Sequence, residues 1–313
     1  MRGSAGVLVA GSANVDHVVR AARIPSPGET VLGRDFSTFP GGKGANQAVA
    51  ASRAGGADVR MLVALGRDDA ANVLECSLRE AGVTLDVRRQ PDLPTGAAFI
   101  CISDDAENAI TVAPGANDAL MPGDLPQLDG VGYLLLQLET PLETVTAYAG
   151  RARAAGVTVV LNAAPARVLP AGLLQAVDVL VVNEGELAML SGGDGGLVAA
   201  MKRLPVARVV VTLGDAGCVA RDGGAFLVQP AFTVEAVDTT AAGDTFCGVL
   251  VAAMARGEPL AAALREAGAA SALACTALGA QSSIPSRVAV QALLRGAGDD
   301  PAARASLAVR CGL

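Results

Sequence analysis

The chain has 313 residues, of which 51% are hydrophobic and 3% aromatic, and its formal net charge is −7. This charge argues against a protein that binds nucleic acid, or an anionic membrane surface, through clustered basic residues. A single histidine, His17, excludes a histidine-rich zinc site and argues against a Ser-His-Asp triad.

The sequence predicts neither an export signal nor a membrane segment. Glycine and polar residues at 11–14 interrupt the first apolar run, and no stretch approaches the ~18 consecutive apolar residues of a membrane helix. The cysteines are scattered without a C-x-x-C pair, which is typical of free thiols in a reducing compartment. We therefore expect a soluble, cytoplasmic protein.

Short, continuous apolar runs recur along the chain and predict the strands of a parallel sheet that is covered on both faces. These runs occupy residues 7–10, 61–64, 133–136, 158–161, 179–182 and 209–212. Stretches rich in Ala, Leu and Arg lie between them and predict helices at 46–54, 70–81 and 142–155. The alternation predicts an α/β fold with a doubly wound, mostly parallel sheet flanked by helices.

Two segments break this alternation. Residues 12–40 and 94–113 carry turn signals and short alternating runs, which predict a small antiparallel β lid. The lid would be inserted into a single domain spanning residues 1–313. The patch at 191–196 and the tail after residue 296 are expected to be surface loops.

The strongest local motif is Val-Asp-Thr-Thr-Ala-Ala-Gly-Asp-Thr-Phe at residues 237–246, directly before an apolar stretch that Gly257 ends. Small residues at a helix start leave backbone N–H groups free to bind the oxygens of a phosphoryl group. Asp244 would lie in the first turn, where a carboxylate can accept the proton of an incoming hydroxyl. Taken alone, Asp244 could equally well be a capping residue.

A glycine-rich motif, Phe-Pro-Gly-Gly-Lys-Gly-Ala-Asn-Gln-Ala, occupies residues 39–48. It is not a Walker A loop, because neither Ser nor Thr follows its Gly-Lys pair. Its glycines would let the backbone approach a polar ligand, with Lys43 and Asn46 as donors. Polar residues also follow two predicted strands, at 11–16 and 137–139, where an α/β fold forms its ligand crevice.

Two later strands are followed by polar motifs as well. Asn183 and Glu186 could orient phosphates bound to Mg²⁺, or could cap the next helix as Asn-x-x-Glu; the cap is favoured, and both roles can coexist. The glycine-spaced turn at 212–218 could let a planar base lie against the backbone.

Together these motifs resemble the ribokinase-type carbohydrate kinase family over about residues 7–290. The resemblance is carried by residues 41–48, 183–186, 212–214 and 238–246, with shorter pieces at 14–16, 27–30, 107–117, 138–139, 161–167 and 279–285. It implies transfer of a phosphoryl group from ATP to the primary 5-hydroxyl of D-ribose, with Mg²⁺ required and K⁺ activating, by a homodimer paired through the lid. The alternative substrates are 2-deoxyribose, a nucleoside or another small sugar. A non-catalytic sugar-binding protein is the alternative class, against which Asp244 and the intact turn before it argue.

The resemblance also implies a role for each site residue. The sugar hydroxyls would be held by Asn14, Asp16, Gly42, Lys43, Asn46 and Glu139. The base would be Asp244, with an anion hole from Ala241, Ala242 and Gly243. The nucleotide would be held by Asn183, Thr212, Leu213, Gly214, Gly217 and Gly243, with Glu186 near Mg²⁺. The K⁺ ligands, partly backbone carbonyls, would come from Asp238, Thr240, Ala274, Ala277, Gly279 and Ser283. The chain departs from the family at Gly268, where Asn or His is often near the adenine, and at Ala277, where a basic residue is often found.

Overall fold

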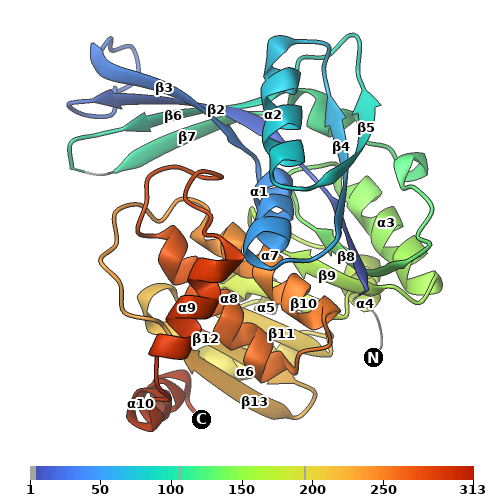
Figure 1. The fold of residues 1–313 in the computed structure, drawn as a ribbon, viewed down its shortest axis with the longest axis vertical. Helices are drawn as coiled ribbons and strands as arrows, with labels where there is room; N and C mark the ends of the chain where they lie inside the picture. Colours follow the sequence, from blue (N-terminus) through green and yellow to red (C-terminus); the bar gives the residue numbers. More distant parts are fainter. Residues whose placement is uncertain (1–4, 106, 194) are drawn as a thin grey trace.

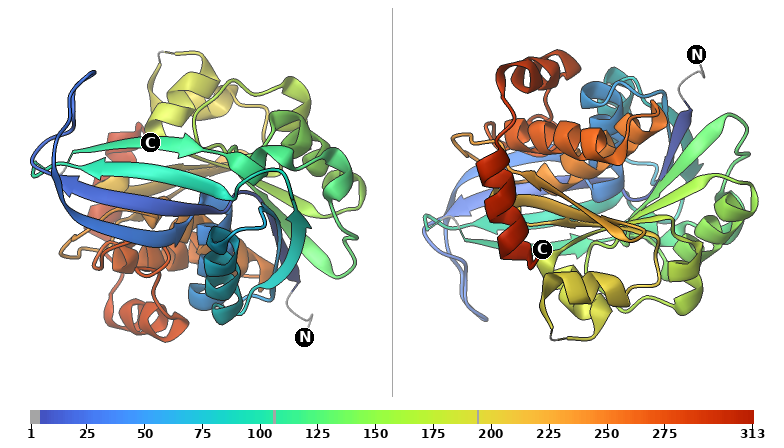
Figure 2. Two further views of the ribbon diagram at one scale, coloured as in Figure 1. Left: turned by 90° about the horizontal axis from the view of Figure 1, so that it is seen from above. Right: turned by 90° about the horizontal axis from the view of Figure 1, so that it is seen from below.

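The computed structural model describes residues 5–105, 107–193 and 195–313, so residues 106 and 194 of the predicted lid and loop lie outside the described residues. A nine-stranded sheet forms the centre of the molecule, in the order β13-β12-β11-β10-β9-β8-β1-β4-β5. Helices cover both of its faces (Figures 1 and 2). The predicted α/β fold class is confirmed.

The strands of this sheet follow the continuous apolar runs. They are β1 (Gly6–Ala10), β4 (Val59–Leu65), β5 (Thr84–Arg89), β8 (Val131–Leu136), β9 (Thr158–Asn162), β10 (Val179–Asn183), β11 (Arg208–Thr212), β12 (Gly217–Asp222) and β13 (Ala225–Pro230). The pairings from β5 to β11 are parallel, and the last two at the other edge, β11–β12 and β12–β13, are antiparallel. Alternate residues of β1 pack into two cores, Val7 and Val9 on one face and Leu8 and Ala10 on the other. Burial on both faces is why these strands are apolar throughout.

Two sets of helices bury these faces. One face is covered by α1 (Lys43–Val49), its π-helical continuation η1 (Ala50–Ala54), α2 (Asp69–Glu80), α7 (Ala242–Ala255), α8 (Leu260–Ala274) and α9 (Arg287–Gly296). The other is covered by α3 (Leu142–Ala154), α4 (Ala171–Ala176), α5 (Glu184–Ser191), α6 (Gly196–Arg203) and α10 (Pro301–Cys311). Short 3₁₀ turns lie at η2 (Gly115–Ala119), η3 (Pro122–Asp124) and η4 (Gly214–Ala216). No helix among the described residues is both long and apolar enough to cross a bilayer.

The prediction of a surface loop after residue 296 is wrong, because α10 forms there. Asp300 caps this helix by accepting a hydrogen bond from the Ala303 N–H, and Pro301 occupies its first turn. Leu307 and Cys311 then pack into the core. A short helix with only two buried apolar residues gives a weak periodic signal in the sequence.

A second, four-stranded sheet is built from the two segments that break the alternation. Its order is β3-β2-β6-β7, with β2 (Asn14–Ala21), β3 (Gly33–Gly41), β6 (Gly96–Ile102) and β7 (Asn108–Ala113). The outer pairings are antiparallel and the central β2–β6 pairing is parallel. This sheet extends from one end of the α/β body (Figure 1). Because β2 begins just after β1 and β3 ends just before α1, the small sheet delivers polar residues to the edge of the large one.

Candidate active site

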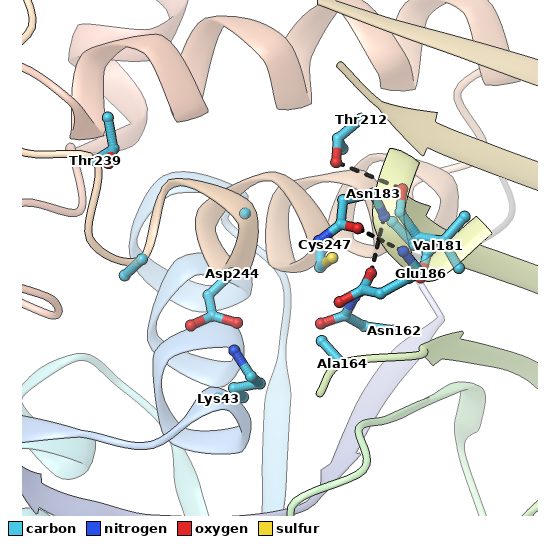
Figure 3. A pocket seen from close by; sticks show the side chains of 13 residues that line it. Lys43, Asn162, Ala164, Val181, Asn183, Glu186, Thr212, Thr239, Asp244 and Cys247 are labelled. Carbon is cyan, nitrogen blue, oxygen red and sulfur yellow. Dashed lines mark hydrogen bonds between the residues drawn. The ribbon is translucent and has the colours of Figure 1, made fainter. Parts of the chain in front are cut away.

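Two adjoining cavities lie where α7 begins. The first, of about 250 Å³, is lined by polar residues of α1, β10, α5 and α7, among them Lys43, Glu186 and Asp244 (Figure 3). The second, of about 430 Å³, lies among the 212–218 turn, the 229–236 segment and α8. Thr212, Thr239 and Gly243 line both, so that one continuous site runs past the start of α7.

The start of α7 has the geometry of an anion-binding turn. Ala241 is its N-cap residue and has a φ of 58°, in the left-handed region that costs a non-glycine residue about 1–2 kcal/mol. Its carbonyl accepts a hydrogen bond from the Thr245 N–H at 2.8 Å. The N–H groups that follow lie at the positive end of the helix: that of Gly243 lies beside both cavities, and that of Ala242, beside the second, donates to the Thr239 carbonyl at 3.2 Å.

Asp244 does not cap this helix. Its Oδ2 accepts a hydrogen bond from Asn46 Nδ2 at 3.0 Å, and its Oδ1 accepts one from Gln47 Nε2 at 2.9 Å. The Lys43 side chain points toward it in Figure 3, and the Asp244 charge raises the pKa of the Lys43 ammonium despite burial. The carboxylate is therefore held by side chains at the mouth of the anion-binding turn, which is the arrangement a general base requires.

Of the residues expected to bind a sugar, Lys43 lines the first cavity, whereas Asn14, Asp16, Gly42, Asn46 and Glu139 line neither cavity and lie on the side of Lys43 and Asp244. Glu139 Oε2 accepts hydrogen bonds from Ser12 Oγ at 2.6 Å and from the Lys43 N–H at 3.0 Å. Asn14 Oδ1 accepts one from Asn117 Nδ2 at 2.8 Å. These bonds fix both side chains, whereas the side chain of Asp16 has no such partner among the described residues.

Asp16 is buried in a crowded, acidic corner. Burial, and then the charges of Glu139 and Asp244, raise the pKa of Asp16 to about 7, while Lys43 opposes the shift. The neighbouring glycines make room for it: a Cβ at Gly41 would lie 2.0 Å from Asp16 Oδ2. A carboxylate kept in such a place without a fixed donor is suited to accept hydrogen bonds from a ligand.

Gly42 shapes the sugar side through its backbone. It has a φ of 88°, and a Cβ there would lie 2.7 Å from the Ala13 Cα, so the position requires glycine. The turn that it makes lets α1 start against the end of β1.

Asn183 and Glu186 form the predicted helix cap, which is confirmed. Asn183 Oδ1 accepts a hydrogen bond from the Glu186 N–H, and Glu186 Oε2 accepts one from the Asn183 N–H, both at 2.8 Å. Both residues also line the first cavity. Burial raises the pKa of Glu186, although the Asn183 N–H and the Lys43 charge oppose this. A carboxylate here supplies the hard oxygen ligand that Mg²⁺ prefers, so the residues present fit that ion.

The predicted turn at 212–218 forms part of the wall of the second cavity. Thr212, Gly214 and Gly217 line it, but Leu213 does not: its side chain is buried in the core, and its N–H donates to the Gly217 carbonyl at 2.8 Å. Gly217 has a φ of 111°, and a Cβ there would lie 2.1 Å from the Gln229 carbonyl oxygen. Leu213 thus anchors the turn to the core and does not itself face the cavity.

Three of the residues expected to bind K⁺, Asp238, Thr240 and Gly279, lie next to one another. Asp238 Oδ1 accepts hydrogen bonds from the Thr240 N–H at 2.9 Å and Oγ1 at 2.6 Å, and its Oδ2 accepts one from the Gly279 N–H at 3.0 Å. These bonds hold the pKa of Asp238 below its usual range, although burial opposes them. Val237 N–H donates to the Cys275 carbonyl at 2.7 Å, which joins this turn to the loop that follows α8.

The donor set of this turn and loop fits a monovalent cation. It offers the Asp238 carboxylate and backbone carbonyls, all hard oxygen ligands. No group of three or more His, Cys, Asp or Glu side chains gathers anywhere in the described ranges, so a site for a transition metal is not indicated there.

Several site residues were not predicted to have a role. They are Gln47, Gln137, Asn162, Thr239, Cys247, Phe232 and Ser271. Gln47 follows Asn46 in the glycine-rich motif, and Asn162 is the last residue of a strand, so the sequence position of each could have indicated a role in the site. Nothing in the sequence marks Phe232, which lies in an irregular segment.

Comparison with known proteins agrees with this geometry. The model of the pfkB family carbohydrate kinases matches residues 4–287. A ribokinase of Haemophilus influenzae is 38% identical over 90% of this chain and 95% of its own length, and a deoxyribokinase of Salmonella typhi is 34% identical over 90% and 95%. The structure of Arabidopsis thaliana ribokinase with ribose and ATP superposes with a TM-score of 0.86 at 32% identity, covering 93% of this chain and 99% of that one.

The fold and the site together define a phosphotransferase that acts on an alcohol group. The chain belongs to the pfkB family of carbohydrate kinases.

Proposed function

We propose that the protein phosphorylates D-ribose at its 5-hydroxyl, converting D-ribose and ATP to D-ribose 5-phosphate and ADP. The observation that carries this proposal is the Asp244 carboxylate, held at the positive end of α7 beside two adjoining cavities. The names of the curated relatives, and the ribose and ATP bound by the Arabidopsis protein, support the choice of substrates.

In the proposed reaction, the 5-hydroxyl oxygen attacks the γ-phosphorus of ATP while Asp244 takes the hydroxyl proton. The bond from phosphorus to the bridging oxygen breaks, and the electron pair leaves with ADP. The N–H groups of Ala241 and Gly243, and that of Ala242 in exchange for its bond to Thr239, would bind the oxygens of the transferring group, where preorganised donors stabilise developing charge. When bound beside Glu186, Mg²⁺ would neutralise charge on the phosphates.

Asp16 supports ribose over 2-deoxyribose. A buried carboxylate that meets the 2- and 3-hydroxyls would be left without one donor by the deoxy sugar, and such a mismatch can cost ~10⁴-fold in specificity in a dry site. Asn14, held by Asn117, would present its amide to the same edge of the sugar. The second candidate substrate is 2-deoxyribose, because one relative of similar identity is named a deoxyribokinase.

We also propose a K⁺ site at Asp238, where the carbonyls of Thr240, Ala274, Ala277 and Gly279 and the Ser283 hydroxyl would complete the ligand set. The ion would neutralise the Asp238 carboxylate and fix the turn that leads into the anion hole. The hydrogen bonds that already join Asp238 to Thr240 and Gly279 support this placement.

We also propose that the protein is a cytoplasmic homodimer, in which two copies pair through the four-stranded sheet β3-β2-β6-β7. Phe36 and Phe99 are exposed on one face of this sheet, and between them the His17 ring stacks on both phenylalanines, with ring centroids 6.0 and 5.3 Å apart. A second copy would cover this apolar face. Light scattering at micromolar concentration should give twice the chain mass, and a monomer would contradict the dimer.

The test of the activity is ADP release in a coupled assay with Mg²⁺ and ATP. D-ribose, 2-deoxyribose, fructose and adenosine are compared, and the Asp244→Asn variant serves as the control for contaminating kinases. We expect kcat/KM for D-ribose to exceed that for fructose and adenosine by orders of magnitude. Preference for adenosine would overturn the ribose assignment and leave the family assignment intact.

A further inference from the structure

Gln47 is fully buried on α1, behind Asp244, and lines neither cavity. Its Nε2 donates to Asp244 Oδ1 at 2.9 Å and to Asn162 Oδ1 at 3.0 Å. Its Oε1 accepts a hydrogen bond from Gln137 Nε2 at 2.6 Å. Both amide hydrogens and the amide oxygen of Gln47 are thus used inside the protein, and none is left for a ligand.

The chemistry of the neighbours sets the direction of this amide. An ionised Asp244 can only accept hydrogen bonds, so Gln47 must present its nitrogen to it. Asn162 Nδ2 donates to the Val181 carbonyl at 3.3 Å, so Asn162 faces Gln47 with its oxygen. The Gln47 oxygen then faces Gln137, which must donate. One carboxylate and one carbonyl thereby orient three amides.

The arrangement is kept at a cost to stability. Gln137 Oε1 is buried and has no hydrogen-bond partner among the described residues, and such an acceptor costs about 1–3 kcal/mol. Space for it depends on Gly11, because a Cβ there would lie 1.9 Å from Gln137 Oε1. Apolar side chains in place of both Gln47 and Gln137 would leave neither amide oxygen without a partner, so we infer that the chain of amides serves a purpose other than stability.

The two donors to Asp244 differ in what they can do when substrate enters. Asn46 is a proposed sugar ligand, and its buried Oδ1 also lacks a partner, so its bonds can be exchanged with the sugar. Gln47 lines neither cavity, so its hydrogen bonds to Asp244, Asn162 and Gln137 are kept when the sugar binds. We propose that Gln47 is a positioning residue: it fixes the Asp244 carboxylate in the direction needed to take the hydroxyl proton, and Gln137 fixes Gln47.

The first test is Gln47→Met, which keeps the side-chain length and removes the donors. This test rests on the proposed role of Asp244 as the base. We expect kcat to fall about 10–100-fold, because a misplacement of about 1 Å in a reacting group can cost ~10²-fold. KM for ribose and ATP should change little, because the lost contact acts in the transition state. Gln137→Met should give a smaller fall in kcat with the same unchanged KM, and it replaces Gln47→Met if that variant does not fold.

The second test uses pH. In Gln47→Glu, the introduced carboxyl can donate to Asp244 only while it is protonated and repels Asp244 when ionised. The ratio of its kcat to that of the wild-type protein should therefore rise as the pH falls from 8 to 6. A residue that merely fills space would give a ratio that does not change with pH.

Thr144→Val is the matched control. Thr144 lies in α3, outside both cavities, and its buried hydroxyl donates to the Leu120 carbonyl at 2.8 Å. This variant also loses a buried hydrogen bond, so its melting temperature should fall, but its kcat should not.

A Gln47→Met kcat within about threefold of wild type, or a Gln47→Glu ratio flat in pH, would overturn the inference. A failure of the proposed base is distinguishable, because it would show as an active Asp244→Asn variant.

Discussion

The two cavities of the site hold their lining residues in different ways. In the first, the Asp244 carboxylate is tied to two other side chains, those of Asn46 and Gln47. In the second, polar side chains are tied to backbone carbonyls: Ser271 Oγ donates to Ala242 at 2.9 Å, and Gln229 Nε2 donates to Pro230 at 2.8 Å. The first cavity therefore presents placed charges, Lys43, Glu186 and Asp244, to whatever it binds. The second is built to receive a flat ligand through shape and apolar contact.

The largest effect should follow from removing the charge at the centre of the first cavity. Asp244→Asn keeps the size of the side chain and removes the proton acceptor. We expect kcat to fall by roughly 10²–10⁴, the usual worth of a positioned general base. Binding of ribose and of ATP, measured by calorimetry, should be nearly unchanged. A turnover within about threefold of wild type would show that Asp244 is not the base.

A several-fold effect is expected from the cation that we propose at the border of the two cavities. Activity should rise when K⁺ or Cs⁺ replaces Na⁺ or Li⁺ at constant ionic strength, because the ion would fix the turn before the anion hole. Asp238→Ala should abolish the difference between the salts. Equal wild-type rates in all four salts, after removal of contaminating K⁺, would contradict the cation site and leave the kinase assignment standing.

Asp16, the buried acid near Glu139 and Asp244, should make stability depend on pH. Because the pKa of Asp16 is raised from 3.8 to about 7, the folded protein keeps a proton that the unfolded chain releases in that interval. The wild-type protein should lose stability as the pH rises from about 4 to 7, and Asp16→Asn should not. The melting temperature of the variant, relative to wild type and without sugar, should thus increase across this window. A constant difference would show that Asp16 ionises normally.

The smallest effect is expected in the second cavity. Gly268 lies inside α8, and a Cβ there would lie 3.8 Å from the nearest Phe232 ring atom, an ordinary contact. Gly268→Ala should raise the free energy of unfolding by about 0.4–1 kcal/mol through the entropy of the unfolded chain. KM for ATP should hardly change. A large rise in KM would show that the base lies directly against this glycine.

The difference between the cavities also explains what the sequence could predict. The buried strands were predictable because burial on both faces leaves continuous apolar runs, and the Asn183–Glu186 cap is a local pattern. The contact of Gln47 with Asp244 spans 197 positions and has no local signature. The second cavity is shaped largely by backbone and by Phe232 in an irregular segment, and such shapes leave little trace in residue types.

The central claim is a division of labour between the polar corner of Asp16 and the second cavity, and crossed binding titrations test it most directly. Ribose and ADP are titrated separately by calorimetry into the wild-type protein, Asp16→Asn and Phe232→Ala. We expect Asp16→Asn to weaken ribose and leave ADP unchanged, and Phe232→Ala to weaken ADP and leave ribose unchanged. Weaker ADP binding in Asp16→Asn, or weaker ribose binding in Phe232→Ala, would contradict the claim.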